Sequence, residues 1–195
     1  MQETLRLFIA IELNPEIHLN LARIAVELKK ERNDEIRWVN PDNIHLTLKF
    51  LGDTPQRNIS SLSETLKQTV FGFLPFEIVV KGTGCFPDAR HPRVLWAGVN
   101  APVTLFELQS NIDRALLTIG IPKENRPFSP HLTLARLSDR TPEAVNSKEP
   151  QKAAPFQNTV FGQMLVERVT LFQSTLTPRG PIYTALVRLP LKSTG

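Results

Sequence analysis

The stretch "NIHLTLKFLG", residues 43–52, alternates apolar and polar side chains with the period of a β-strand. Its letters HLTL occur again in "SPHLTLARLS", residues 129–138. On a strand, residues two apart share a face and lie about 6.6 Å from one another. His45 and Thr47 are therefore expected on one face, and the two leucines that alternate with them on the opposite face.

The second copy divides in the same way. His131 and Thr133 share one face, and Leu132 and Leu134 share the other. If two related lobes face each other, two imidazoles and two hydroxyls converge on one cleft. Histidines on opposite sides of a phosphorus atom could act as base and acid, because the imidazole pKa of about 6.5 makes both protonation states accessible at neutral pH. The hydroxyls could hold the non-bridging phosphate oxygens.

A structural role and a metal site are the two alternatives for this repeat. A single His-x-Thr on a strand is usually structural, since short motifs match often by chance. A repeat that keeps the polar residues as well as the core residues is hard to explain by packing alone. A zinc site would need further ligands, and neither copy is accompanied by a cysteine pair, a glutamate or a third histidine. The pattern therefore favours a catalytic pair without a metal.

Composition is that of a globular chain with one core. The 195 residues are 41% apolar and 22% charged, which argues against disorder. The formal net charge of +4 is consistent with a ligand that carries phosphate. Cys85 is the single cysteine, so no disulfide framework exists and we expect a cytoplasmic protein. No signal peptide is visible, and no apolar run approaches the roughly 20 residues of a membrane helix.

Hydrophobic periodicity predicts an alternation of strands and helices. Helices are expected after Asn14 as N-cap, over 56–70 and over 101–121 with an end at Gly120. Strands are expected at 5–13, 44–51, 75–86, 93–99, 131–137, 164–175 and 182–191. Gly52-Asp53 is expected to end the second of these strands, and residues 138–158 to form a long loop.

This order of elements predicts an α+β fold. Hairpin-like pairs of strands separate the strand–helix units, so antiparallel sheets fit better than a strictly alternating parallel sheet. No hydrophilic linker divides the chain. We therefore expect one domain over residues 1–195, with two pseudo-symmetric lobes, an antiparallel sheet flanked by helices in each, and the active site in the central cleft.

The sequence resembles the two-histidine (2H) phosphoesterases, whose signature is a pair of His-x-Thr/Ser motifs. Within them it is similar to the RNA 2′,3′-cyclic phosphodiesterases, also called 2′-5′ RNA ligases. The resemblance covers nearly the whole chain and rests on five segments, which are "RLFIAIEL" (6–13), "RWVNPDNIHLTLKFLGD" (37–53), "RVLWAGV" (93–99), "RPFSPHLTLAR" (126–136) and "LFQSTLTPRGPIYTAL" (171–186).

The resemblance implies hydrolysis of a 2′,3′-cyclic phosphate at an RNA end to a 2′-phosphate, without a metal or nucleotide cofactor. By analogy, His131 would be the general base that activates water, and His45 the general acid that protonates the departing 3′ oxygen. Thr47 and Thr133 carry over as phosphate ligands. Arg136 matches an arginine that the family places at the active site, where its planar fork suits a phosphate or the face of a base.

Strand geometry raises a question about two of the candidates. Arg136 lies five residues after His131, an odd offset that points it away from the histidine in a regular strand, so a bulge or the strand end would have to turn it back. Phe50 has the same offset from His45. It could stack on a nucleobase, but parity places it with the core leucines and favours core packing.

Other reactions and a role without catalysis remain open. The same cleft could join RNA ends through a 2′-5′ linkage, with a 5′-hydroxyl in place of water, or could hydrolyse a small cyclic nucleotide. A module that binds RNA or nucleotides without catalysis is the alternative of a different class, and the presence of both histidines and both threonines argues against it. The expected partners are RNA ends or nucleotides with a 2′,3′-cyclic phosphate, no membrane is involved, and nothing requires more than a monomer.

Overall fold

Strands and helices follow one another much as the hydrophobic pattern predicts. The computed structural model describes residues 3–30, 36–88, 92–137, 156–178 and 180–192. The helices are α1 (Pro15–Lys30), α2 (Ile59–Val70) and α3 (Val103–Leu117), with short 3₁₀ turns at η1 (Pro41–Asn43) and η2 (Gln56–Asn58). The strands are β1 (Thr4–Ile11), β2 (Ile36–Trp38), β3 (Leu46–Pro55), β4 (Phe76–Phe86), β5 (Val94–Asn100), β6 (His131–Leu137), β7 (Val160–Val166), β8 (Arg168–Thr177) and β9 (Gly180–Pro190).

Two helix ends have the predicted chemistry. The Asn14 side chain accepts a hydrogen bond of 2.9 Å from the Ile17 amide and so caps the first turn of α1. Gly120 follows the last turn of α3 and adopts a left-handed conformation, with a φ of 83°. The amides of Gly120 and Ile121 donate to the carbonyls of Leu117 and Leu116, which is the hydrogen-bond pattern of a Schellman motif.

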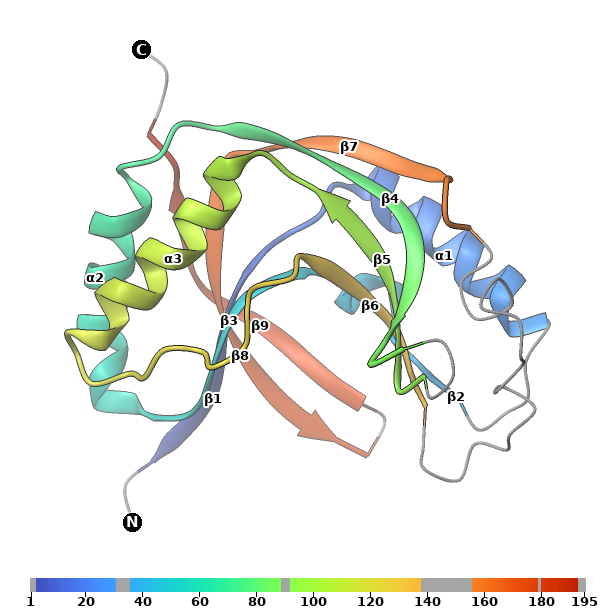
Figure 1. The fold of residues 1–195 in the computed structure, drawn as a ribbon. Coiled ribbons are helices and arrows are strands. Elements are labelled where there is room, and N and C mark those ends of the chain that lie inside the picture. Colours follow the sequence, from blue (N-terminus) through green and yellow to red (C-terminus); the bar gives the residue numbers. More distant parts are fainter. Residues whose placement is uncertain (1–2, 31–35, 89–91, 138–155, 179, 193–195) are drawn as a thin grey trace.

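Within the described residues every strand pair is antiparallel, and the strands form two sheets. The first sheet has the order β3-β1-β8-β9 and the second the order β2-β6-β5-β4-β7. In Figure 1, α2 and α3 lie on one flank of the molecule and α1 on the other, with the sheets between them. The predicted α+β class, with two antiparallel sheets flanked by helices in two lobes, is confirmed.

Two predicted strand boundaries are wrong, and one short strand was missed. Residues 164–175 are two strands rather than one, because β7 pairs with β4 in the second sheet while β8 pairs with β1 and β9 in the first. Gly52-Asp53 does not end β3, which runs on to Pro55 through an irregularity at Gly52, where φ is 66°. The short strand β2 was not predicted. The predicted loop at 138–158 lies, apart from 156–158, outside the described residues.

The arrangement contains an internal repeat. The units β1–α1–β3 and β5–α3–β6 each consist of two paired strands joined through a helix, and each ends in the strand with the HLTL motif. The helices are exchanged between the lobes, since α1 packs on β7 of the second sheet and α3 packs on β3 of the first. This reciprocal exchange ties the lobes together.

The leucines of both HLTL strands lie in the core. Leu46, Leu48, Leu132 and Leu134 are at most 2% exposed and belong to one hydrophobic cluster that includes residues of both sheets. A separate small cluster of Phe8, Ala10 and Phe172 lies away from this core, with Tyr183 and Ala185 packed against it. The leucines thus face the core as predicted, which leaves the polar residues between them on the other face of each strand.

Candidate active site

His45 lies immediately before β3, against an aromatic cluster of the first lobe. Its Nδ1 is 2.7 Å from the carbonyl oxygen of Asn43. The imidazole stacks on Phe8, with ring centroids 4.7 Å apart, and meets Tyr183 edge-on at 5.2 Å. The Asn43 side chain donates to the carbonyl of Pro181, just before Tyr183 on β9. These contacts fix the ring on both sides.

His131 is the first residue of β6 and is held in a matching way. Its Nδ1 is 2.7 Å from the carbonyl oxygen of Ser129, again two residues earlier in the chain. Phe86, at the end of β4, meets the ring edge-on at 5.0 Å. The two copies of the motif thus agree in the position of the histidine, in its backbone partner and in the presence of a phenylalanine from another strand.

The backbone contacts determine which nitrogen of each ring can react. A carbonyl oxygen can only accept a hydrogen bond, so Nδ1 of both histidines carries a proton. Nε2 is then the nitrogen that accepts a proton in the neutral ring and donates one in the cation. Both histidines have the tautomer that an acid–base pair acting through Nε2 requires.

The environment of His45 changes its acidity. Burial among the aromatic rings lowers the pKa of the His45 imidazole below its usual value, and the hydrogen bond to the Asn43 carbonyl opposes this to a smaller extent. Burial acts in this direction because a low-dielectric environment disfavours the charged form. Without a ligand, His45 therefore favours the neutral form more than an ordinary histidine does.

Thr47 and Thr133 occupy equivalent places on their strands. Thr47 lies opposite Ala10 of β1, and Thr133 lies opposite Trp96 of β5. Both side chains are partly exposed, and neither hydroxyl has a hydrogen bond to another of the described residues. The hydroxyls are available to an outside ligand on the same face as the histidines.

A β-bulge follows each HLTL motif and changes the direction of the residues after it. On β3, Ala10 and Ile9 pair with Thr47 and Lys49, so Leu48 is the additional residue. On β6 the additional residue is Leu134, at the matching position. An additional residue reverses the alternation of faces, so the fifth residue after each histidine returns to the histidine face.

The bulges decide the orientation of Phe50 and Arg136. The preference for Phe50 in the core is wrong, because its side chain is 60% exposed and lies 6.3 Å from the ring of Phe8, which stacks on His45. The bulge required to turn Arg136 back to the histidine face is present on β6. The side chain of Arg136 is exposed. Their contact with a substrate stays a prediction.

The two lobes meet at the strands that carry the HLTL motifs. Strands β3 and β6 contact each other where the lobes meet. Burial raises the pKa of the Tyr183 phenol, and the charges of Arg136 and Arg6 oppose this increase. Arg136 belongs to the second sheet, and Tyr183, whose ring lies edge-on to His45, belongs to the first. The strands that carry the two motifs therefore meet, and the convergence of His45 and His131 on one site stays a prediction.

Sequence reasoning did not identify the aromatic residues around the histidines. Phe8 and Phe172 stack with centroids 5.1 Å apart, and Tyr183 meets Phe8 edge-on at 4.9 Å. A signal was present in β1, where Phe8 alternates with Leu7 and Ile9, but that strand is apolar on both faces. Which face carries the aromatic residues depends on the neighbouring strands.

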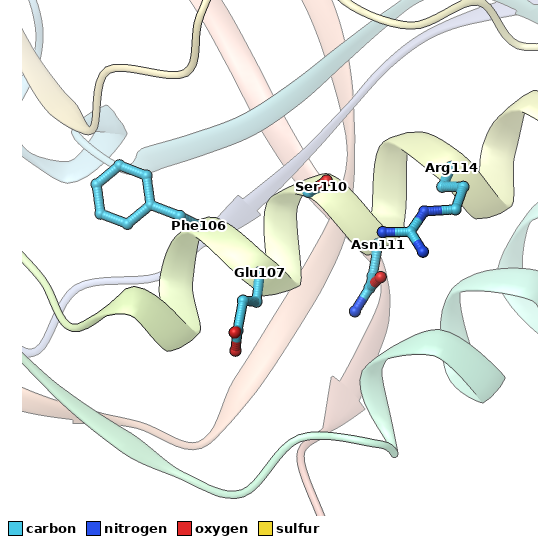
Figure 2. Close-up of a pocket in the computed structure, with 5 residues that line it drawn as sticks. All are labelled: Phe106, Glu107, Ser110, Asn111 and Arg114. Atoms are coloured by element: carbon cyan, nitrogen blue, oxygen red, sulfur yellow. The ribbon is translucent and has the colours of Figure 1, made fainter.

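Two hollows lie elsewhere, on the outer side of the helices. One, of about 440 Å³, is lined by Phe106, Glu107, Ser110, Asn111 and Arg114 of α3, which Figure 2 shows along that helix. The other, of about 460 Å³, lies between α3 and the end of α2. Neither is lined by a predicted site residue, and the cleft expected between the lobes remains a prediction.

The described residues contain no cluster of potential metal ligands. There, no three side chains of His, Cys, Asp or Glu gather closely enough to hold a metal ion. His18, on α1, is directed to the carbonyl oxygen of Pro41 at 2.9 Å. No helix in the same part of the chain is long and apolar enough to cross a bilayer.

Comparison with known proteins identifies the same repeat. The family model described as LigT-like phosphoesterase matches the chain twice, over residues 11–96 and over residues 98–183. Each match contains one HLTL strand. The double match agrees with the repeated strand–helix–strand unit.

Relatives align over nearly the full length. A protein of Methanothermobacter thermautotrophicus named RNA 2′,3′-cyclic phosphodiesterase is 36% identical, over 92% of this chain and 95% of its own length. One of the same name from Thermotoga maritima is 35% identical, over 93% of each chain. Among solved structures, a protein of Thermus thermophilus superposes with a TM-score of 0.80 at 28% identity, covering 97% of this chain and 100% of that one. E. coli LigT complexed with 3′-AMP superposes with a TM-score of 0.76 at 27% identity, covering 98% and 100%.

Proposed function

Because the chain belongs to the LigT-like phosphoesterase family, we propose that it is an RNA 2′,3′-cyclic phosphodiesterase that hydrolyses the cyclic phosphate at an RNA end to a 2′-phosphate. The observation that carries this proposal is the matched pair of histidines. Each is the first residue of an HLTL motif, has Nδ1 directed to the carbonyl two residues earlier and leaves Nε2 to react. The reaction needs one base and one acid on opposite sides of phosphorus.

In the proposed mechanism the two histidines have different roles. Nε2 of neutral His131 removes a proton from water as the water oxygen attacks phosphorus. The bond between phosphorus and the 3′ oxygen breaks, and Nε2 of protonated His45 donates its proton to that oxygen. The products are a 2′-phosphate and a free 3′-hydroxyl. Exchange of protons with solvent returns both imidazoles to their starting states.

The acidity of His45 supports its role as the acid. An imidazolium whose pKa burial has lowered gives up its proton to a departing alkoxide more readily. The negative charge of a bound phosphodiester opposes the effect of burial and favours the protonated ring before the reaction. Substrate binding thus prepares the acid.

Four further residues are assigned to substrate binding. The hydroxyls of Thr47 and Thr133 donate hydrogen bonds to the non-bridging oxygens of the reacting phosphate. Arg136 stabilises the phosphate or the face of the base, since it follows its bulge onto the histidine face. Phe50 offers an exposed ring on which a nucleobase can stack.

An RNA oligonucleotide that ends in a 2′,3′-cyclic phosphate tests the proposal in the presence of excess EDTA. We expect the wild-type protein to produce a 2′-phosphate, identified by ³¹P NMR. The variants His45→Ala and His131→Ala should each lose activity by at least about 10²-fold. His18→Gln is the matched control, because its amide can still donate to the Pro41 carbonyl.

Each alternative has its own outcome in this experiment. Loss of activity with EDTA would indicate a metal. A 2′-5′ linked product on addition of RNA with a 5′-hydroxyl would add ligation, because Nε2 of His131 can deprotonate a hydroxyl as well as water. Hydrolysis of cyclic mononucleotides but not of RNA would mean that the substrate is a small cyclic nucleotide. Binding of RNA without turnover would mean that the protein is a binding module without catalysis, and would overturn the proposal.

The remaining assignments concern the state of the protein. We place it in the cytoplasm, on the ground of its single cysteine. We assign it no metal or nucleotide cofactor, and a monomer suffices because one chain supplies both histidines. Gel filtration with light scattering tests the monomer.

A further inference from the structure

Two arginines lie opposite each other at the edge of the second sheet. Arg37 of β2 is the direct cross-strand partner of Arg136 of β6. Such partners share a face, with Cβ atoms about 4.5–5.5 Å apart, and like charges in these positions repel. Both side chains are exposed, and neither forms an ion pair with another of the described residues. An anionic ligand would relieve this repulsion.

The register places this pair on the face of the candidate active site. Arg136 returns to the His131 face at the bulge, and Arg37 shares that face as its partner. Strand β2 is the outermost of the second sheet, so Arg37 lies one strand beyond Arg136. Neighbouring strands are about 4.8 Å apart.

The two arginines therefore differ in their distance from the first lobe. The charge of Arg136 acts on Tyr183, whose ring lies 5.2 Å from that of His45. We therefore expect Arg136 to contact the nucleotide that carries the reacting phosphate. Arg37 continues the positive face outward, on the strand beyond Arg136.

We propose that Arg37 binds the phosphodiester group that precedes the cyclic phosphate, and so makes an RNA chain a better substrate than a cyclic mononucleotide. This inference rests on the proposed function and assigns its substrate class. A chain carries a negative charge at each internal phosphodiester, and a cyclic mononucleotide has none beyond the reacting group. A guanidinium binds such a group through two parallel hydrogen bonds.

Two substrates that share the same reacting end test this inference. They are uridine 2′,3′-cyclic monophosphate and a dinucleotide that ends in the same cyclic group. In Arg37→Gln we expect kcat/KM for the dinucleotide to fall roughly tenfold, as for the loss of a charge-assisted hydrogen bond, while kcat/KM for the mononucleotide remains unchanged. Arg37→Lys should retain part of the preference. Arg114→Gln removes the same charge from the outer side of α3 and is the matched control.

Salt dependence gives a second readout that a structural defect would not produce. For the dinucleotide, the logarithm of kcat/KM should depend less steeply on the logarithm of salt concentration in Arg37→Gln, by about 0.7 for one lost phosphate contact to a single strand. Equal losses for both substrates, or no loss for either, would overturn the inference.

Failure of the proposed function would look different, because the wild-type protein would then hydrolyse neither substrate. Binding can still be measured in that case, by calorimetry with the dinucleotide and mononucleotide 2′-phosphates. We expect Arg37→Gln to weaken binding of the dinucleotide alone. Equal affinities of wild type and variant for the dinucleotide would overturn the inference, and thermal unfolding of each variant verifies that it is folded.

Discussion

At the scale of single residues, the account depends on the protonation of His45. The sequence identified this histidine and its partner His131, because the motif occurs twice with the same polar face. The difference between the two rings could not be predicted, because the aromatic cluster that buries His45 comes from β1, β8 and β9. Burial is a property of the assembled fold.

The first prediction concerns the titration of His45. Its imidazole should titrate below the ordinary histidine value of about 6.5. A bound phosphate monoester such as uridine 2′-monophosphate should raise this pKa, because the anion favours the imidazolium. NMR titration of the imidazole signals, assigned with His45→Gln, measures both values. An ordinary pKa in the free protein, or no increase on binding, would contradict the account.

The same shift predicts a pH dependence of the rate. The acid must be protonated, so activity falls as the pH rises through the pKa of His45. In kcat/KM, which reflects the free protein, this alkaline limb should lie at lower pH than in kcat, which reflects the complex. Rates measured from about pH 5 to pH 9 provide both profiles, and an alkaline limb at the same pH in both would argue against His45 as the acid.

A third prediction concerns Phe50. Its exposed ring is expected to stack on a base, so Phe50→Ala should weaken substrate binding by about 1–3 kcal/mol, seen as a higher KM with little change in kcat. Phe50→Tyr keeps the ring and should behave like the wild type. A loss confined to kcat would mean that the ring acts on the chemistry rather than on a base.

At the scale of elements, the bulges at Leu48 and Leu134 explain where sequence reasoning failed. Alternation placed the histidines, the threonines and the leucines correctly, because all of them lie before or at the bulge. It placed Phe50 in the core because it assumed a regular strand. Whether a bulge forms depends on how the neighbouring strand pairs with this one. The periodicity of a single strand holds no information about that pairing.

The bulge on β3 also places a charge in the core. Lys49 is 2% exposed, and its ammonium group forms an ion pair with Asp113 of α3 and donates to the Pro122 carbonyl at 2.8 Å. Gln109 donates to Asp113 at 3.3 Å and to the Leu48 carbonyl, within the bulge, at 3.5 Å. This network joins α3 to the bulge that orients Phe50.

The fourth prediction follows from the burial of this pair. Asp113→Asn leaves the Lys49 charge buried without its partner and should lower the free energy of unfolding by about 3–5 kcal/mol. The double variant Lys49→Met/Asp113→Leu should lose less than the single variant, since no charge is left unpaired. Urea unfolding at neutral pH measures both, with Glu64→Gln on the exposed side of α2 as control. A decrease in the free energy of unfolding of less than about 1 kcal/mol for Asp113→Asn would contradict the prediction that the buried Lys49 requires Asp113 as its partner.

At the scale of the whole molecule, the two repeats form one unit. The antiparallel α+β class was predictable because strands and helices have distinct periods and turn signals. The exchange of α1 and α3 between the lobes, and the return of β8 to the first sheet, were not predictable, because they are contacts between distant segments. Neither half of the repeat has a complete sheet of its own.

The fifth prediction is that the lobes unfold together. Trp38 and Trp96, the two tryptophans, lie on β2 and β5 of the second sheet, so their fluorescence reports that sheet alone. Far-UV circular dichroism reports both sheets and all helices. We expect the two probes to give the same urea midpoint, as in a two-state transition. Separate midpoints would mean that the lobes fold independently.

The central claim is that His45 and His131 act on one phosphate as a pair. The most direct test is the single-turnover rate of cleavage of an RNA 2′,3′-cyclic phosphate by His45→Ala, His131→Ala and the double variant. Residues that act as a unit are not additive, so the double variant should be no slower than the slower single variant. Losses that multiply in the double variant, or a single variant that retains the wild-type rate, would contradict the account.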